Sequence, residues 1–89
     1  MNEKKLMELK IDLLEYIGII DQYNKAEAED IVKEEEKHDY LHEYKGNDGR
    51  AYLWYLDNVH NVAICIETEE IFEKEEIDEI FGINGCYTT

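Results

Sequence analysis

The apolar residues of the first twenty positions recur at steps of three and four, the spacing that places them on one face of an α-helix. The sequence therefore predicts a core helix over about residues 3–22. Three carboxylates at helical spacing, Glu8, Asp12 and Glu15, give the opposite face of this helix an acidic character. The apolar stripe consists of Leu6, Leu9, Leu13, Ile17 and Ile20.

A second helix is predicted over about residues 25–37, where apolar residues are few. Asn24 followed three residues later by Glu27 has the form of a helix start, because the Asn side chain can accept a backbone N–H and the Glu can reach back. Only Ala28, Ile31 and Val32 offer an apolar edge. We therefore expect this helix to lie on the surface with one edge in contact.

From Asp39 onward the hydrophobic period changes to two, which is typical of β-strands. The turn-forming sequence GNDG at 46–49 separates two alternating segments, so a hairpin is predicted. A third alternating segment follows at 62–66. Because the middle segment RAYLWYL is apolar on both faces, it should be a central strand covered by helix on one side.

The acidic stretch ETEEIFEKEEIDEIF, residues 67–81, is predicted to form the last helix, with Ile77, Ile80 and Phe81 facing inward and Gly82 ending it. The chain then reads as one α+β domain over residues 1–89. Its expected order is two N-terminal helices, a three-stranded antiparallel β-meander and a C-terminal helix. Carboxylates interrupt the apolar N-terminal run, so we interpret it as a helix of the mature protein and not as a signal peptide.

Charge narrows the function. The chain carries 23 acidic and 9 basic residues, a net charge of −14, and eight of the carboxylates lie within residues 67–81 beside Lys74 alone. A single arginine, Arg50, argues against direct binding of nucleic acid or anionic lipid, because phosphate contacts need Lys and Arg. The sequence contains no Ser, which removes serine nucleophiles and the usual phosphate-binding loop. The natural partner should therefore be basic.

Catalytic candidates are few. His38 and His42 are four residues apart and would share a face if helical, which leaves a small metal-dependent enzyme as an alternative. Cys65 lies in the most apolar strand, where a small buried thiol is the ordinary finding. Two cysteines indicate free thiols in a reducing compartment. We expect a protein without catalysis, cofactor or metal.

An acidic binding surface explains the charge better. Carboxylates one helical turn apart lie about 5–6 Å from each other, comparable to phosphates along a nucleic-acid strand. Nearby aromatic residues would supply packed anchors, or would serve self-association in a homodimer. The predicted contact residues are Glu69, Glu70, Glu73, Glu76, Asp78 and Glu79 from the last stretch, Glu34 and Glu35 from the second helix, and Tyr52 and Trp54 from the hairpin.

In its small size, strong acidity, α+β order and Glu-rich stretches at 27–36 and 67–81, the chain resembles the phage-encoded inhibitors that mimic nucleic acid, including anti-CRISPR proteins and inhibitors of restriction or repair enzymes. The resemblance lies in overall character and in no motif, so it transfers no residue. It implies a protein of the bacterial host cytoplasm that occupies the nucleic-acid groove of a nuclease or effector complex. The alternative is an immunity or antitoxin-type partner that neutralises one cognate toxin.

Overall fold

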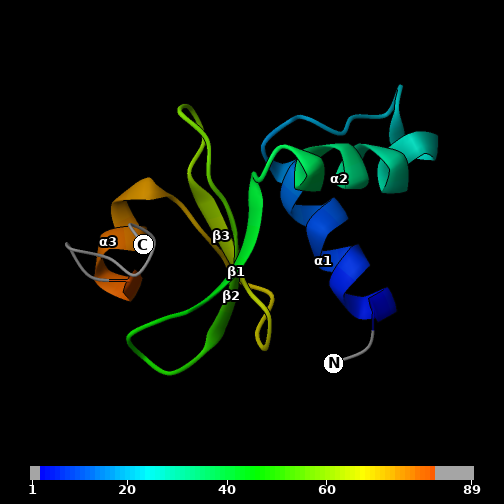
Figure 1. The fold of residues 1–89 in the computed structure, drawn as a ribbon. Helices are drawn as coiled ribbons and strands as arrows, with labels where there is room; N and C mark the ends of the chain where they lie inside the picture. The colour runs from blue at the N-terminus through cyan, green and yellow to red at the C-terminus, as the bar shows by residue number, and fades with distance from the viewer. Residues whose placement is uncertain (1–2, 82–89) are drawn as a thin grey trace.

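The computed structural model describes residues 3–81, apart from the side chains of Asp78 and Phe81. Helices at both ends of the described chain enclose four consecutive strands in an α+β fold, which confirms the predicted class (Figure 1). The predicted roles of Gly82 and of the Phe81 side chain lie outside the described residues. The elements are α1 (Glu3–Tyr16), the 3₁₀ helix η1 (Lys25–Glu27), α2 (Ala28–Lys37), β1 (Leu41–Lys45), β2 (Ala51–Tyr55), β3 (Val62–Cys65), β4 (Ile71–Phe72) and α3 (Lys74–Phe81).

The sheet is antiparallel with the strand order β1-β2-β3-β4. Its first three strands form the predicted meander, with Tyr44 opposite Tyr52 and Trp54 opposite Ala63. The fourth strand was not predicted. The β1–β2 turn is closed by the Gly46 N–H, which donates to the Arg50 carbonyl at 2.8 Å.

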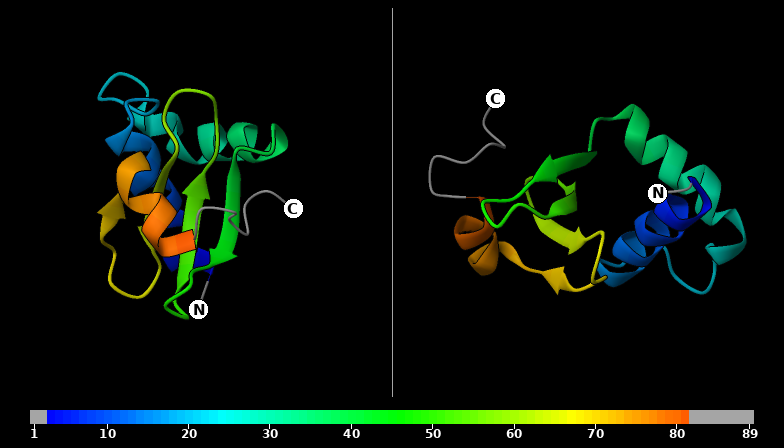
Figure 2. Two further views of the ribbon diagram at one scale, coloured as in Figure 1. Left: turned by 90° about the vertical axis from the view of Figure 1, so that its left-hand side faces the viewer. Right: turned by 90° about the horizontal axis from the view of Figure 1, so that it is seen from below.

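Helices cover both faces of the sheet (Figures 1 and 2). α1 and α2 lie on one face, and α3 lies on the other. The prediction placed helix over one side of β2, and the structure has helix on both sides. The physical reason is the apolar character of both faces of β2, since each face has to be removed from water. Residues Tyr52 to Tyr55 are all buried.

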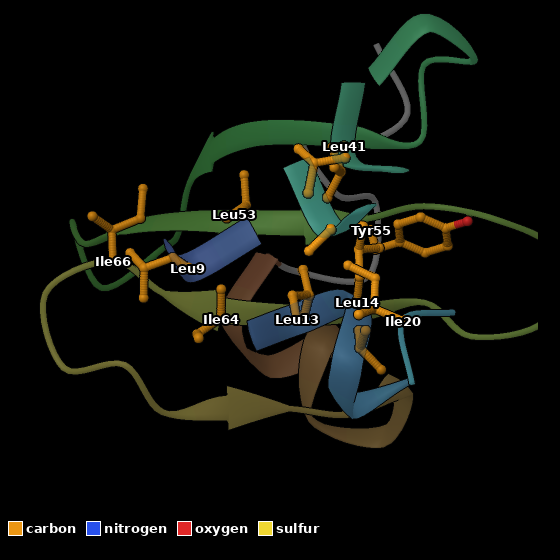
Figure 3. Packing of buried hydrophobic residues seen from close by; sticks show 12 residues of the cluster. Leu9, Leu13, Leu14, Ile20, Leu41, Leu53, Tyr55, Ile64 and Ile66 are labelled. Atoms are coloured by element: carbon orange, nitrogen blue, oxygen red, sulfur yellow. The ribbon is translucent and has the colours of Figure 1, made fainter. Parts of the chain in front are cut away.

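Each face of the sheet has its own cluster of buried residues. Leu53 and Tyr55 of β2 face α1 and α2, whereas Tyr52 and Trp54 face Ile77 of α3. Burial of Ile77 and packing of Ile80 on the second cluster confirm their predicted inward orientation. Figure 3 shows the first cluster, in which α1 contributes Leu9, Leu13 and Leu14 and the sheet contributes Leu41, Leu53, Tyr55 and Ile64.

α1 ends at Tyr16, six residues before the predicted boundary at 22. Gly18 has a φ of +88°, a left-handed conformation that glycine adopts without a Cβ penalty. The Ile19 N–H donates to the Leu14 carbonyl and the Gly18 N–H to the Glu15 carbonyl, the paired bonds of a Schellman motif. Apolar residues at helical spacing continue beyond Gly18, so this spacing alone predicted a helix that was too long.

The predicted capping of the second helix by Asn24 and Glu27 is also wrong. No side chain caps η1 or α2 at their N-termini. The Asn24 Oδ1 instead accepts the Asp21 N–H at 2.6 Å, and its Nδ2 donates to the Ile19 carbonyl at 3.1 Å. Asn24 therefore holds the connection after α1 in place, and the helical region begins with a 3₁₀ turn.

The acidic stretch forms three elements and not one helix. A tight turn follows β3, in which the Glu69 N–H donates to the Cys65 carbonyl and the Cys65 N–H to the Glu70 carbonyl, both at 2.8 Å. Glu69 adopts a φ of +63° within this turn. Ile71 then pairs with Ile64 in the sheet, and α3 begins only at Lys74. Pairing of Ile71 and Phe72 with β3 overrides the helical spacing.

Candidate functional site

The acidic face of α1 lies beside the segment that leads from β3 to α3. At the first turn of α1, the Lys5 Nζ donates to the Glu69 Oε2 at 2.8 Å. At its last residue, the Tyr16 hydroxyl donates to the Glu73 Oε1 at 2.9 Å. These two bonds hold residues 69–73 along the length of the helix.

This arrangement brings carboxylates from two distant parts of the chain together. Partial burial, and then the charges of Glu15, Glu69 and Glu8, raise the pKa of Asp12 above its usual range. The bond to Glu73, with the Glu73 and Glu76 charges, raises the pKa of the Tyr16 phenol in the same way. Negative charge therefore concentrates along α1 and the neighbouring segment. We call Glu8, Asp12, Glu15, Glu69, Glu73 and Glu76 the acidic patch.

Two lysines pair with carboxylates of the acidic patch. Lys5 binds Glu69 at 2.8 Å, and Lys25 binds Glu15 at 3.0 Å. Exposed pairs of this kind contribute about 0–1 kcal/mol and are screened by salt. With six carboxylates against these two lysines, the acidic patch keeps an excess of negative charge.

The remaining predicted carboxylates lie outside the acidic patch. Glu70 and Glu79 are exposed on the β3–β4 turn and on α3. Glu34 lies on α2 at the N-terminal-helix face of the sheet, where its carboxylate is within 3.6 Å of the Lys37 Nζ and 3.2 Å of the His38 Nε2. α2, which carries Glu34, and α3, which carries Glu79, lie on opposite faces of the sheet (Figure 1).

Glu35 is half-buried against the core rather than presented to solvent. Burial, together with the nearby Glu35 carboxylate, raises the pKa of the Tyr55 phenol above its usual range. The side chain of Asp78, another predicted contact, lies outside the described residues. Glu35 is thus better explained as a fold contact than as a binding residue.

The hairpin aromatics predicted as partner contacts belong to the core. Tyr52 and Trp54 are each 1% exposed. The Tyr52 hydroxyl donates to the Asp48 Oδ2 at 2.6 Å, and burial with this bond raises its pKa to about 12. Trp54 packs edge-on against Tyr44 with ring centroids 5.5 Å apart. Tyr52 and Trp54 were predicted to form part of the contact surface, and their burial corrects that prediction. Both side chains lie on the face of β2 that α3 covers.

The two histidines considered as metal ligands, His38 and His42, each contact a different group of the protein. His38 follows the last residue of α2, and its Nε2 lies 3.2 Å from the Glu34 Oε1. His42 lies on β1, with its Nε2 2.6 Å from the Asp39 carbonyl oxygen. Among the side chains that the structure describes, no group of three or more His, Cys, Asp or Glu residues is arranged to hold a metal ion. Cys65 is a buried free thiol, as predicted. The metal-dependent alternative gains no ligand set from this part of the chain.

The helical spacing of Glu8, Asp12 and Glu15 already indicated an acidic face, but the sequence did not connect that face to residues 69–76. The two hydrogen bonds that connect them, Lys5 to Glu69 and Tyr16 to Glu73, span 64 and 57 positions of the chain. Tyr16, which is 50% exposed, joins the two halves of the surface and was not predicted as a site residue.

No protein-family model, curated protein or solved structure matches the chain. Among the described residues, no helix has the length and apolar character that crossing a membrane requires.

Replacing Asp12 by Asn is expected to stabilise the fold at pH 7. The raised pKa means that the folded state binds a proton at Asp12 more tightly than the unfolded state, so the ionised carboxylate costs stability. A gain of up to about 0.5 kcal/mol is typical for such a surface change. It should vanish as the pH falls through the raised pKa, where wild-type Asp12 also becomes neutral. Urea denaturation at several pH values measures both effects, and a gain that persists in acid would contradict this electrostatic cause.

Proposed function

We propose that the protein is a non-enzymatic inhibitor that binds the basic, nucleic-acid-binding surface of another protein, in the manner of anti-CRISPR or anti-restriction proteins. The observation that carries this proposal is the acidic patch. Carboxylates of α1 and of residues 69–76 converge on one surface, where Lys5 and Lys25 pair with only two of them. A solvated face needed only for solubility does not require such convergence.

The acidic patch is a fixed array, which favours its use as a substitute for a polyanion. α1 is anchored by Leu9, Leu13 and Leu14, each fully buried. The adjoining segment is held by the Lys5–Glu69 and Tyr16–Glu73 bonds. A partner therefore loses little free energy in ordering the acidic patch, and the concentrated charge accelerates encounter with a basic groove.

Tyr16 supplies the aromatic contact that the buried hairpin residues do not. Its ring is half exposed, and its hydroxyl is already oriented by Glu73. Tyrosine is enriched among residues that dominate binding energy, because a rigid ring offers apolar area together with a polar tip. We assign Tyr16 the role of the anchor within the acidic patch, between carboxylates that act mainly on the association rate.

Capture from a bacterial lysate tests the proposal. Immobilised protein should retain a nucleic-acid-binding protein, and an excess of duplex DNA or RNA should release it, because both ligands occupy one surface. In a gel shift at low salt, the protein itself should not bind the same oligonucleotides. Retention that survives saturating nucleic acid would favour a toxin-neutralising partner with a different binding surface, and direct saturable binding of an oligonucleotide would refute the mimic.

A further inference from the structure

The outer edge of β1 offers a second interaction surface that is unlike the acidic patch. β1 is the first strand of the sheet order, so among the described residues no strand pairs with its outer side. The backbone bonds that flank it join Tyr40 to Leu56 and Gly46 to Arg50. Since ladder bonds alternate along an antiparallel pair, the even-numbered residues of β1 bond to β2. The N–H and C=O groups of Leu41, Glu43 and Lys45 therefore point outward.

The outer half of β1 carries one carboxylate and one ammonium group on either side of an aromatic ring. Glu43 and Lys45 are exposed, and Tyr44 between them is half-buried. Hollows of about 360 Å³ and 310 Å³ adjoin Glu43, one toward Leu41 and the other toward Lys45. The opposite edge, β4, is flanked by Glu69, Glu70 and Glu73. For a chain of net charge −14, the residues of the β1 strand itself therefore repel a second copy less than those that flank β4.

We propose that two copies of the chain associate through β1 into a continuous antiparallel sheet. A two-fold axis beside Tyr44 places the two Tyr44 residues opposite each other in a non-hydrogen-bonded pair. It also places Glu43 of each copy opposite Lys45 of the other, with the outward backbone groups of both residues hydrogen-bonded. Because Leu53 and Ala51 are the intrachain partners of Glu43 and Lys45, the two ion pairs lie on the face covered by α1 and α2.

Charge selects this register over its neighbours. A register centred on Glu43 places the Glu43 carboxylates of the two copies opposite each other. A register centred on Lys45 places the two Lys45 ammonium groups opposite each other. Like charges directly opposite each other destabilise a strand pair. The register centred on Tyr44 replaces both repulsions with two attractive pairs and brings two aromatic rings together.

This arrangement does not rest on the inhibitor function, but it has a consequence for it. The acidic patch adjoins the β3–β4 turn, at the other side of the sheet from β1. Two copies joined at β1 therefore carry their acidic patches at the far ends of the assembly, where mutual repulsion is lowest. Such a dimer presents two separate acidic surfaces to its partners.

Sedimentation equilibrium over a concentration series tests the dimer. The wild type should approach twice its monomer mass of 10.6 kDa. Glu43→Lys and Lys45→Glu should each raise the dissociation constant roughly tenfold or more, because two cross-strand pairs become repulsive. The double variant Glu43→Lys/Lys45→Glu, which keeps the wild-type net charge, should restore association.

A proline at position 43 provides an independent check. Glu43→Pro removes an outward N–H that β2 does not use, and proline is tolerated on edge strands in this orientation. The variant should stay folded by circular dichroism and become monomeric. A wild type that remains monomeric at every concentration, or a dimer that all of these variants leave unchanged, would overturn the proposal.

Discussion

Replacing Trp54 by Ala is expected to reduce the free energy of unfolding by about 3–5 kcal/mol, because truncation of a buried aromatic loses its apolar contacts and leaves a cavity. Trp54 is 1% exposed and packs among Tyr44, Tyr52 and Ile77. Small domains have about 5–15 kcal/mol of stability in total, so the variant should be partly unfolded at 37 °C. Urea denaturation followed by far-ultraviolet circular dichroism measures the loss without relying on Trp fluorescence.

Tyr23→Ala is the matched control for this experiment. Tyr23 is 88% exposed, so its truncation should change stability by less than about 0.5 kcal/mol. A loss below about 1 kcal/mol in the Trp54 variant would be inconsistent with a core position. Such a result would support the alternative prediction from the sequence, in which Trp54 is a contact residue on the surface.

Neutralising the acidic patch is expected to have the largest effect on function. A variant with Gln at Glu8, Glu15, Glu69, Glu73 and Glu76 and Asn at Asp12 removes six charges but keeps side-chain size. Its association with a captured partner should slow by about ten- to a hundredfold, because steering by concentrated charge accounts for factors of this size. Stability should hold or rise as repulsion between the carboxylates is relieved. Stopped-flow or surface binding kinetics at several salt concentrations measures the change.

A control variant removes the same number of charges elsewhere on the protein. It carries amides at six exposed carboxylates that do not belong to the acidic patch and lie on α2, on η1 and at the start of α1: Glu3, Glu27, Glu29, Asp30, Glu34 and Glu36. On our proposal this control retains most of the association rate and most of its salt dependence. Equal losses in both variants would show that net charge acts alone and that the acidic patch is no defined site.

Local signals in the sequence predicted most of the fold. Alternation around the GNDG turn correctly placed β1 and β2, and the apolar β2 correctly indicated a central strand. The end of α1 was not predicted correctly, because apolar residues continue the helical spacing after Gly18. The apolar residues after the helix still contribute to the core, since Ile20 is only 2% exposed. Hydrophobic spacing therefore located the core but not the boundary of the helix.

The acidic stretch shows where local reasoning fails. Ile77 and Ile80 are spaced as on one face of a helix, but Ile71 lies six residues before Ile77 and would fall on a different side of it. Ile71 pairs with Ile64 of β3 instead. The acidic patch depends on the same long-range arrangement. Glu69 and Glu73 were predicted as binding residues, but the bonds from Lys5 and Tyr16 that join them to α1 cross most of the chain. No local pattern reports such a contact.

Competition for a purified partner tests the central proposal most directly. The partner is first bound to a fluorescently labelled oligonucleotide, and anisotropy is followed while this protein is added. The wild type and the control variant should return the anisotropy to that of the free oligonucleotide, whereas the acidic-patch variant should require a much higher concentration. If the oligonucleotide stays bound while the wild-type protein saturates the partner, the two ligands occupy different surfaces and the protein does not act as a nucleic-acid mimic.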